Sequence, residues 1–370
     1  MYKILAACLF LWVSCTTMQP RSTETGGNTN SNQTSDNTTI IPAAPGSRNP
    51  VGTLVNIPLS EPESNKKRMS VYNMLGAPYV RHTLTMQSWN GSNDFYEKLN
   101  SAGYKIILNV VATPQGGGPR PFTHDMVTYK KKLEEILSVY KPELLVVENE
   151  EYNQTYYNGY MSEYLTILKT AIEVAHAKGI KVCNGGLTGR LLSLLTYFDY
   201  RNRGMMSEAE DFAKRTQLAS INQVLPNISK IPYLEKGMIG MDTLIKAYKN
   251  LNLDYVNIHW YEPMYLRSPK APSAANVDQI DTKSIGEVVD FLKRSTGKKI
   301  ITNEIGQINS SPNIVRSVID KCISLNMDYI IWYSGDGDDA NDAVGLHNYD
   351  GTLRPNGKAF ADYIKQKFPR

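Results

Sequence analysis

The feature that most constrains this fold is an alternation of two kinds of segment that begins at residue 51. Short runs rich in valine, isoleucine and leucine alternate with longer segments that have the apolar spacing of helices. Many of the short runs lack polar alternation, so both of their faces are expected to be buried, as in a parallel sheet covered by helices. The eight predicted strands are residues 51–57, 79–86, 104–111, 143–149, 180–187, 254–260, 298–303 and 327–332.

Nine helical segments accompany the eight predicted strands, two of them in the long connection after the fifth strand, which gives eight strand–helix units. They are predicted at residues 63–75, 94–102, 123–140, 160–178, 207–225, 241–251, 283–296, 312–325 and 358–367. Eight such units fit a single (β/α)8 TIM barrel over residues 51–370, with an extended connection between the fifth and sixth strands. An open, doubly wound sheet is the main rival, but no glycine-rich phosphate-binding loop follows any predicted strand. The Gly116-Gly117-Gly118 run is flanked by prolines and is interpreted as a flexible turn.

The first fifty residues have the composition of a targeting segment followed by a linker. Lys3 precedes an apolar stretch, residues 4–13, that is too short to span a bilayer as a mature helix. The following Ser14-Cys15 resembles a bacterial lipobox, in which the cysteine carries lipid after cleavage; the alternative is an ordinary secretory signal that contains a cysteine. We expect a lipoprotein signal peptide over residues 1–14, then a lipidated Cys15 and a disordered linker to residue 50. The barrel is then expected outside the cytoplasm, lipid-anchored to a bacterial outer membrane or cell surface.

Replacement of the lipid-bearing cysteine tests this interpretation. Cys15→Ala is expected to move the protein from the membrane fraction to the soluble fraction, because the lipid is the only membrane attachment that the sequence predicts. Fractionation followed by immunoblotting measures the change, with the neighbouring Thr16→Ala as the matched control. Membrane retention of the Cys15→Ala protein would contradict lipid anchoring.

Charge and cysteine content exclude other classes of function. The formal net charge of +4 on 370 residues is small, and no basic stripe of the kind that binds nucleic acid is present. Outside the signal and the lipobox only Cys183 and Cys322 remain, and we expect both to be buried apolar residues, although a disulfide between them stays possible. No Cys/His cluster has the spacing of a zinc site, so we expect no metal, and we expect no cofactor. We also expect the protein to be a monomer.

Tryptophans gather at the ends of the predicted strands. Trp89, Trp260 and Trp332, the three tryptophans beyond the predicted signal peptide, each follow or end a predicted strand. Active sites of (β/α)8 barrels lie at the carboxyl ends of the strands. Aromatic rings at such a face pack well against the C–H faces of sugars, so we interpret these tryptophans as stacking platforms for a glycan.

Two Asn-Glu pairs lie at the same face. Asn149-Glu150 ends the fourth predicted strand, and Asn303-Glu304 ends the seventh. Cleavage of a glycoside with retention needs a carboxylic acid to protonate the leaving oxygen and a carboxylate nucleophile, with the two groups about 5–5.5 Å apart. Strands four and seven lie on opposite sides of a barrel mouth, so the two glutamates are placed to flank one sugar.

With these residues the chain resembles the clan-A retaining glycoside hydrolases, a (β/α)8 superfamily with catalytic glutamates after strands four and seven. The resemblance covers the chain from about residue 51. The motifs that carry it are Arg81, Asn149-Glu150, His259-X-Tyr261, Glu304 and Trp332, and the tail motifs Gly345-Leu346, Asp350-Gly351-Thr352, Arg354-Pro355 and Lys358-Ala359-Phe360.

The resemblance implies a retaining hydrolase that cleaves a β-linked oligo- or polysaccharide by double displacement. Glu150 would be the acid/base and Glu304 the nucleophile. The side chains implied to support them are Arg81 and Tyr261, which would orient Glu304, Asn149 on the sugar 2-hydroxyl, His259 beside the subsite and Trp332 as its floor. A non-catalytic carbohydrate-binding lipoprotein on the same barrel is the alternative function.

One departure from the family leaves the fourth strand end open. The family often has tryptophan or another apolar residue before the Asn-Glu pair and proline or a similar turn residue after it, whereas here Glu148 and Glu151 flank the pair. If the strand ends earlier, Glu148 would replace Glu150 as the acid/base. Crowding among these acids would raise the pKa of one of them, which suits an acid catalyst.

Other side chains have two open interpretations each. Arg81 either serves the site or pairs with a core carboxylate, and His259 either lines the site or is a satisfied strand-end histidine. The acids among residues 336–342 form either a calcium site or, as their spacing favours, a solvated loop. Tyr156, Tyr157 and Tyr160 either contact sugar or cap the following helix.

Overall fold

The computed structural model describes residues 40–369 except residues 45, 58, 113–123, 154–155, 157–159, 217, 219–220, 222–224, 226, 229–230, 262–281, 308–310 and 336–344. The predicted signal peptide, Cys15, most of the predicted linker, the triple-glycine turn, Tyr157 and the acidic loop lie outside the described residues. Within the described part, no helix has the length and apolar character needed to cross a membrane.

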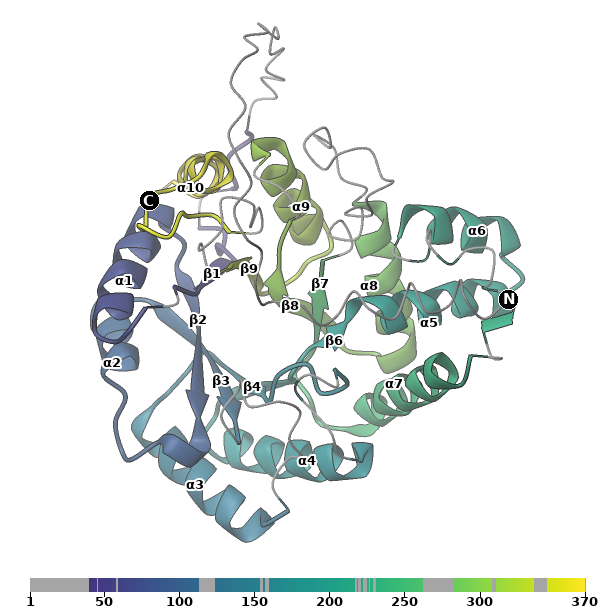
Figure 1. Cartoon of the computed structure of the whole chain (residues 1–370), viewed down its shortest axis with the longest axis horizontal. Coiled ribbons are helices and arrows are strands. Elements are labelled where there is room, and N and C mark those ends of the chain that lie inside the picture. The colour runs from purple at the N-terminus through teal and green to yellow at the C-terminus, as the bar shows by residue number, and fades with distance from the viewer. Residues whose placement is uncertain are drawn as a thin grey trace, which may run out of the picture. The chain divides into compact units, whose positions relative to one another are not determined.

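The described strands form one parallel sheet that closes on itself. They are β1 (Val51–Val55), β2 (Tyr79–Thr85), β3 (Lys105–Val111), β4 (Leu144–Val147), β5 (Lys181–Asn184), β6 (Leu187–Thr188), β7 (Tyr255–Trp260), β8 (Lys299–Ile305) and β9 (Ile330–Ser334). Their order is β5-β4-β3-β2-β1-β9-β8-β7-β6, and the pairing of β5 with β7 completes the ring. The predicted (β/α)8 barrel is therefore confirmed (Figure 1).

The fifth predicted strand is divided into β5 and the two-residue β6, so that together they fill one position in an eight-stranded barrel. Gly185 and Gly186 separate them. Gly186 has a φ of +131°, and a Cβ there would lie 2.3 Å from Nε2 of His259. Only glycine lets the backbone pass this close to the imidazole, and the strand breaks as a result.

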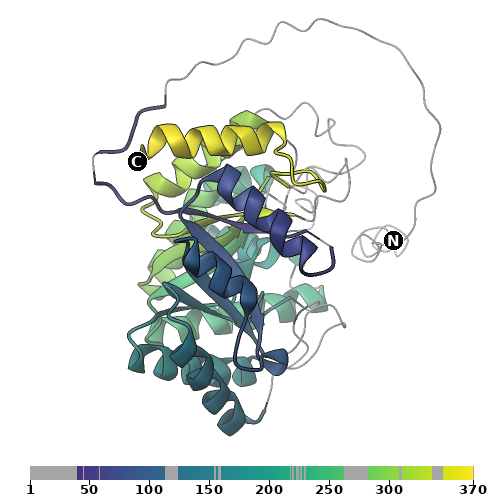
Figure 2. The same cartoon turned by 90° about the vertical axis from the view of Figure 1, so that its left-hand side faces the viewer.

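Helices surround the strands as an outer layer (Figures 1 and 2). They are α1 (Glu63–Leu75), α2 (Asp94–Ser101), α3 (Met126–Val139), α4 (Met161–Ala177), α5 (Gly189–Asn202), α6 (Met206–Arg215), α7 (Pro232–Asn250), α8 (Lys283–Thr296), α9 (Pro312–Ser324) and α10 (Pro355–Lys367). Between β6 and β7 lie α5, α6 and α7, where the sequence predicted two helices. The prediction missed α5, which begins immediately after β6 without a side-chain N-cap to mark its start.

Inward-facing side chains divide the barrel interior into an apolar level and a polar level. The apolar level consists of Tyr79, Ile107, Leu144, Val146, Cys183, Tyr255, Ile301, Tyr329 and Ile331. Two residues further along their strands, toward the carboxyl ends, the inward positions carry Arg81, Asn109, Asn257 and Asn303. Because side chains alternate along a strand, each of these polar residues follows an apolar one on the same face. The polar level supports the site at the mouth.

Both remaining cysteines are buried and free, as expected of small apolar residues. Cys183 lies on β5 inside the barrel, and Cys322 lies on α9 in the layer between helices and strands.

Candidate active site

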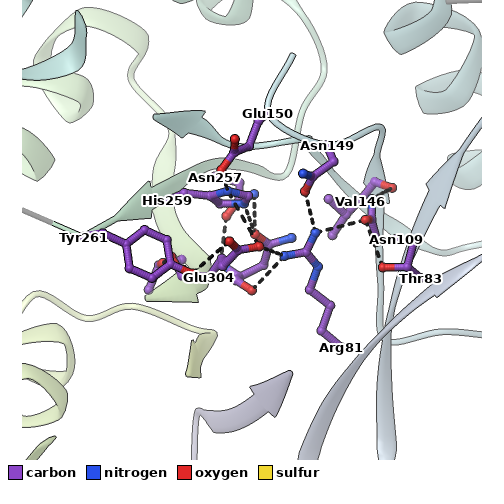
Figure 3. A network of polar contacts seen from close by, with 12 residues as sticks. Arg81, Thr83, Asn109, Val146, Asn149, Glu150, Asn257, His259, Tyr261 and Glu304 are labelled. Carbon is purple, nitrogen blue, oxygen red and sulfur yellow. Dashed lines mark hydrogen bonds and ion pairs between the residues drawn. The ribbon is translucent and has the colours of Figure 1, made fainter. Parts of the chain in front are cut away.

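Glu304, near the end of β8, is held on both of its carboxylate oxygens. The Tyr261 hydroxyl donates a hydrogen bond to Oε1 at 2.8 Å, and Nη1 of Arg81 donates to Oε2. Figure 3 shows these donors approaching the carboxylate from opposite sides. The Glu304 side chain keeps 15% of its surface exposed, so it is fixed in orientation and still open at the mouth.

Arg81 places its guanidinium at the centre of the polar level. Its side chain is 3% exposed. Besides the ion pair with Glu304, its Nη2 donates to Oδ1 of Asn109 at 3.0 Å and to Oδ1 of Asn149 at 2.6 Å. Burial of a cation is favourable only when it is paired and hydrogen-bonded, and all of these acceptors come from different strand ends. Arg81 therefore joins β2 to the ends of β3, β4 and β8 (Figure 3).

The charge state of Glu304 follows from these contacts. Burial raises the pKa of a carboxyl, but the nearby His259 and Arg81 charges and the hydrogen bonds from Tyr261 and Arg81 outweigh it, so the pKa of Glu304 lies below its ordinary value. Burial, with the charge of Glu304, raises the pKa of Tyr261 well above its ordinary value, so its hydroxyl stays a donor. Glu304 is an ionised, oriented carboxylate.

Glu150, and not Glu148, faces Glu304. One oxygen of Glu150 and one of Glu304 lie within 4.8 Å of each other, with a ring nitrogen of His259 inside the same limit. Oε1 of Glu150 is 2.9 Å from Nδ1 of His259, and Oε2 accepts a hydrogen bond from Asn153 at 2.5 Å. Glu148 instead accepts a hydrogen bond from the backbone of Ala112, away from this group.

The hydrogen bonds around His259 fix which of its ring nitrogens carries a proton. The backbone N–H of Asn303 donates to Oδ1 of Asn257, which sets the orientation of that amide. Nδ2 of Asn257 then donates to Oδ1 of Asn303 at 2.8 Å, and the same Oδ1 lies 2.7 Å from Nε2 of His259. Because this oxygen only accepts, Nε2 must donate. Nδ1 is left to face Glu150.

It follows that Glu150 and His259 share one further proton. Nδ1 and a carboxylate oxygen at 2.9 Å would repel each other if neither carried hydrogen. The proton lies on the carboxyl or on the imidazole, and the pair is neutral overall in both cases. Burial lowers the pKa of His259, but the Glu304 and Glu150 carboxylates outweigh burial, so its pKa lies above its ordinary value. The Glu150–His259 pair thus holds one exchangeable proton next to the ionised carboxylate of Glu304.

The same three side chains have the composition of a small metal site. Glu150, His259 and Glu304 each offer a donor atom within 4.8 Å of the others. Their other contacts favour a proton over a metal ion. Glu304 already pairs with the Arg81 guanidinium, which would repel a cation, and Nε2 of His259 donates to Asn303. The arrangement suits acid–base chemistry.

The three tryptophans do not lie where the sequence suggested, and their interpretation as stacking platforms is wrong for Trp260 and Trp332. Both are fully buried, at 1% and 0% exposure, in the layer between strands and helices, and Trp332 packs against Phe360 of α10 with ring centroids 6.3 Å apart. They occupy strand positions that alternate with the inward-facing ones. Trp89 is partly buried and packs near Tyr140, after α3, on the outside of the barrel.

This placement predicts that Trp332 contributes to stability and not to sugar binding. Trp332→Ala is expected to lower the free energy of unfolding by about 3–5 kcal/mol, because it leaves a large cavity under α10. Urea unfolding measures the loss. The matched contrast is Tyr333→Ala, one residue along the strand and partly exposed, which is expected to have a smaller effect on stability. A Trp332→Ala protein with wild-type stability would contradict this placement.

Sequence reasoning missed several residues of the site. Tyr333, on the inward face of β9, is partly exposed at the mouth, and its ring lies 6.1 Å from that of Tyr261 at 90°. Asn109 and Asn257 bridge the strand ends. The available signal was a polar residue at an inward position of an otherwise apolar run, as in KIILNVV and YVNIHW. Asn153 was not detectable, because only the turn after β4 brings it to Glu150.

The tyrosines after the fourth strand are only partly described. Tyr160 is the N-cap residue of α4, where Glu163 accepts a hydrogen bond from its backbone N–H, and its ring is exposed. The Tyr156 ring is also exposed. These positions fit the helix-capping interpretation for Tyr160.

The sequence matches no protein-family model and no curated protein. The structure is similar to solved glycoside hydrolases. A GH128 endo-β-1,3-glucanase from Amycolatopsis mediterranei, in complex with laminaritriose, is 11% identical with a TM-score of 0.47, over 85% of this chain and 100% of that chain. A GH5-4 broad-specificity endoglucanase from Clostridium acetobutylicum is 12% identical with a TM-score of 0.49, over 85% and 97%. A β-mannanase from Thermomonospora fusca, in complex with mannohexaose, is 16% identical with a TM-score of 0.43, over 83% and 86%. At these identities the likeness concerns the fold.

Proposed function

We propose that this chain is a retaining glycoside hydrolase that cleaves a β-linked glycan, with Glu304 as nucleophile and Glu150 as acid/base. The observation that carries the proposal is the pairing of two carboxyl groups, with oxygens within 4.8 Å, in opposite electrostatic settings. Retaining enzymes hold their carboxyls about 5–5.5 Å apart, whereas inverting enzymes need about 6.5–9.5 Å to admit a water molecule. Oxygens within 4.8 Å of each other are compatible with the closer, retaining arrangement, and this supports double displacement.

The settings of the two groups match the two roles. Arg81 and Tyr261 keep Glu304 ionised and aim it, as a nucleophile requires. Glu150 shares a proton with His259, as a group that alternates between acid and base requires. Environments that separate the protonation states of two neighbouring carboxyls are the usual basis for such a division of labour.

The first half of the reaction forms a covalent intermediate. Glu304 attacks the anomeric carbon and forms a glycosyl ester while the glycosidic C–O bond breaks. The Glu150–His259 pair delivers its proton to the departing oxygen through Glu150. Asn149, whose Oδ1 is held by Arg81, would present its amide nitrogen to the sugar 2-hydroxyl. The aromatic ring of Tyr333 lies at the edge of the mouth, where it would contact the sugar ring.

The second half regenerates the enzyme. Glu150 takes a proton from water as the water oxygen attacks the anomeric carbon, and the ester to Glu304 breaks. The proton returns to the Glu150–His259 pair, and the carboxylate of Glu304 returns to its contacts with Arg81 and Tyr261. Two inversions at one carbon leave the product in the β configuration.

The stereochemistry of the first product tests this mechanism. We expect proton NMR, recorded during hydrolysis of laminari-, cello- and manno-oligosaccharides, to show the β-anomer of a new reducing end before mutarotation. Initial appearance of the α-anomer would indicate inversion and would exclude the double-displacement mechanism.

A carbohydrate-binding barrel without turnover is the second candidate, and it would share this mouth. The enzyme is favoured because both carboxyl groups are present and because Arg81 and Tyr261 both contact Glu304. Binding to glycans without cleavage of any member of a broad β-glycan panel would favour the binding protein instead.

A further inference from the structure

The turn that follows β4 has an unusual backbone. Glu148 has a φ of +64° and Glu150 a φ of +44°, and Asn326 is the other non-glycine residue with positive φ in the described part of the chain. The left-handed conformation is unfavourable for any residue with a Cβ, because that atom approaches the following carbonyl oxygen. Two such residues in three positions persist only if the surrounding contacts hold them. This conformation brings the Glu150 side chain to His259.

Glu148 fastens the first side of this turn to β3. Its backbone N–H donates to the carbonyl of Val110 at 2.9 Å, and its own carbonyl accepts from Asn109 at 2.7 Å. Its side chain is turned away from the mouth, where Oε1 accepts from the backbone N–H of Ala112 at 2.9 Å. Glu148 is 4% exposed. The strand end is therefore fixed by both the backbone and the carboxyl.

Glu151 fastens the other side to β5 and α7. It is 0% exposed, and its Oε1 accepts from Nδ2 of Asn184 at 2.8 Å and from the Tyr248 hydroxyl. A Cβ on Gly185 would lie 2.9 Å from both Oε2 of Glu151 and the Glu148 carbonyl, so this part of the barrel is built closely around the turn. Oε2 of Glu151 is buried, with no partner among the described residues.

Neither carboxyl forms an ion pair with a described residue, and both are buried, so both are suited to the neutral form. Burial raises the pKa of Glu148 to about 8, with a partly offsetting hydrogen bond from Ala112. Burial also raises the pKa of Glu151 and outweighs the hydrogen bonds from Tyr248 and Asn184 and the charge of His259, which lower it. A neutral carboxyl acts here through its shape and its hydrogen bonds.

We propose that Glu148 and Glu151 are positioning residues, buried on the two sides of the turn, that hold Glu150 in its left-handed conformation against His259. The inference rests on the proposed function for Glu150 and deepens it. It also gives a role to the two acids that depart from the family pattern. Neither residue contacts the reacting atoms, so each acts only through the placement of Glu150.

Substitution by alanine and by glutamine separates position from charge. Glu148→Ala and Glu151→Ala are each expected to lower kcat at least about tenfold with KM within about twofold, because displacement of a catalytic group by about 1 Å is costly. Glu148→Gln and Glu151→Gln keep the accepting oxygen and the volume, so each is expected to retain kcat within about threefold. The matched control is Glu143→Gln, at the exposed opposite end of β4. Folded alanine variants with wild-type kcat would overturn the proposal.

A stability measurement tests, without an alanine variant, whether Glu148 is buried in its neutral form. The pKa of Glu148 is about 8 in the folded chain and ordinary in the unfolded chain, so the folded state binds more protons between these values. Stability is then fully present below the ordinary pKa and is lost as pH rises toward about 8. The slope of the unfolding free energy over this range is expected to be smaller in Glu148→Gln than in the wild type. An unchanged slope would contradict the conclusion that Glu148 is a buried, neutral carboxyl.

A crystal structure distinguishes failure of this inference from failure of the proposed function. If the wild type cleaves no glycan, the proposed function fails, and the position of Glu150 in Glu151→Gln and Glu151→Ala crystals decides the positioning role. The expected result is a Glu150 that keeps its contact with His259 in the glutamine variant and loses it in the alanine variant. An unmoved Glu150 in Glu151→Ala would overturn the inference.

Discussion

Glu304→Gln is expected to lower kcat at least about 10⁴-fold on any β-glycan that the wild type cleaves, because an amide cannot form the glycosyl ester. Glutamine keeps the volume of glutamate and an oxygen that accepts from Arg81 or Tyr261, so the mouth should keep its shape. We therefore expect the dissociation constant for an uncleaved oligosaccharide to change by less than about threefold. Isothermal titration calorimetry and initial rates measure the two quantities.

The control for Glu304→Gln is Glu143→Gln, which neutralises an exposed glutamate at the far end of the barrel. Circular dichroism and thermal unfolding establish that the variant is folded, since Arg81 loses its ionic partner. A folded Glu304→Gln protein that retains more than about one-hundredth of the wild-type kcat would exclude Glu304 as the nucleophile.

Glu150→Ala is expected to show a loss that depends on the leaving group. With a sugar leaving group, which needs a proton, kcat should fall by about 10²–10⁴-fold. A dinitrophenyl glycoside needs no proton to depart, so the first step should continue while hydrolysis of the ester slows, because no base activates the water. The expected observation is a rapid burst of dinitrophenolate followed by a slow steady state. Stopped-flow absorbance measures both phases.

Added azide provides the complementary test of Glu150. As an anionic nucleophile it needs no general base, so it should restore turnover of the dinitrophenyl glycoside by Glu150→Ala and yield a β-glycosyl azide. Equal losses on both substrates, with no burst and no response to azide, would contradict the acid/base role. A burst in Glu148→Gln but not in Glu150→Ala would transfer the role to Glu148.

The sequence carried enough information for the barrel because burial patterns are local. A run such as KIILNVV, with apolar residues on both faces, is compatible with a strand between helices and with little else. The long region after the fifth strand was harder. Its start has no capping residue, and the break at Gly185-Gly186 depends on the approach of His259 from β7, which no local pattern records.

The residues of the candidate site also fall into two groups: those that local sequence patterns predict and those that they do not. Arg81 and Tyr261 were predictable because strand alternation sets the direction of their side chains. Glu304 was predictable from its place near a strand end, but an irregularity in the register of β8 between Thr302 and Ile305, and not alternation, lets it face the mouth next to the inward-facing Asn303. The tryptophans were misplaced because position at a strand end was considered without the direction of the side chain. Trp260 and Trp332 lie one residue away from the inward face, and a shift of one residue reverses the face.

The sequence by itself determined a parallel (β/α)8 barrel with two carboxylates at strand ends, because strand periodicity and the types of residue at strand ends are properties of neighbouring residues. Only the tertiary structure decided that Glu150 rather than Glu148 faces Glu304. That choice depends on two left-handed residues held by contacts with β3, β5 and α7, which are distant in the chain. The tertiary structure also decided the proton on His259, because Asn257 and Asn303 orient it from two further strands.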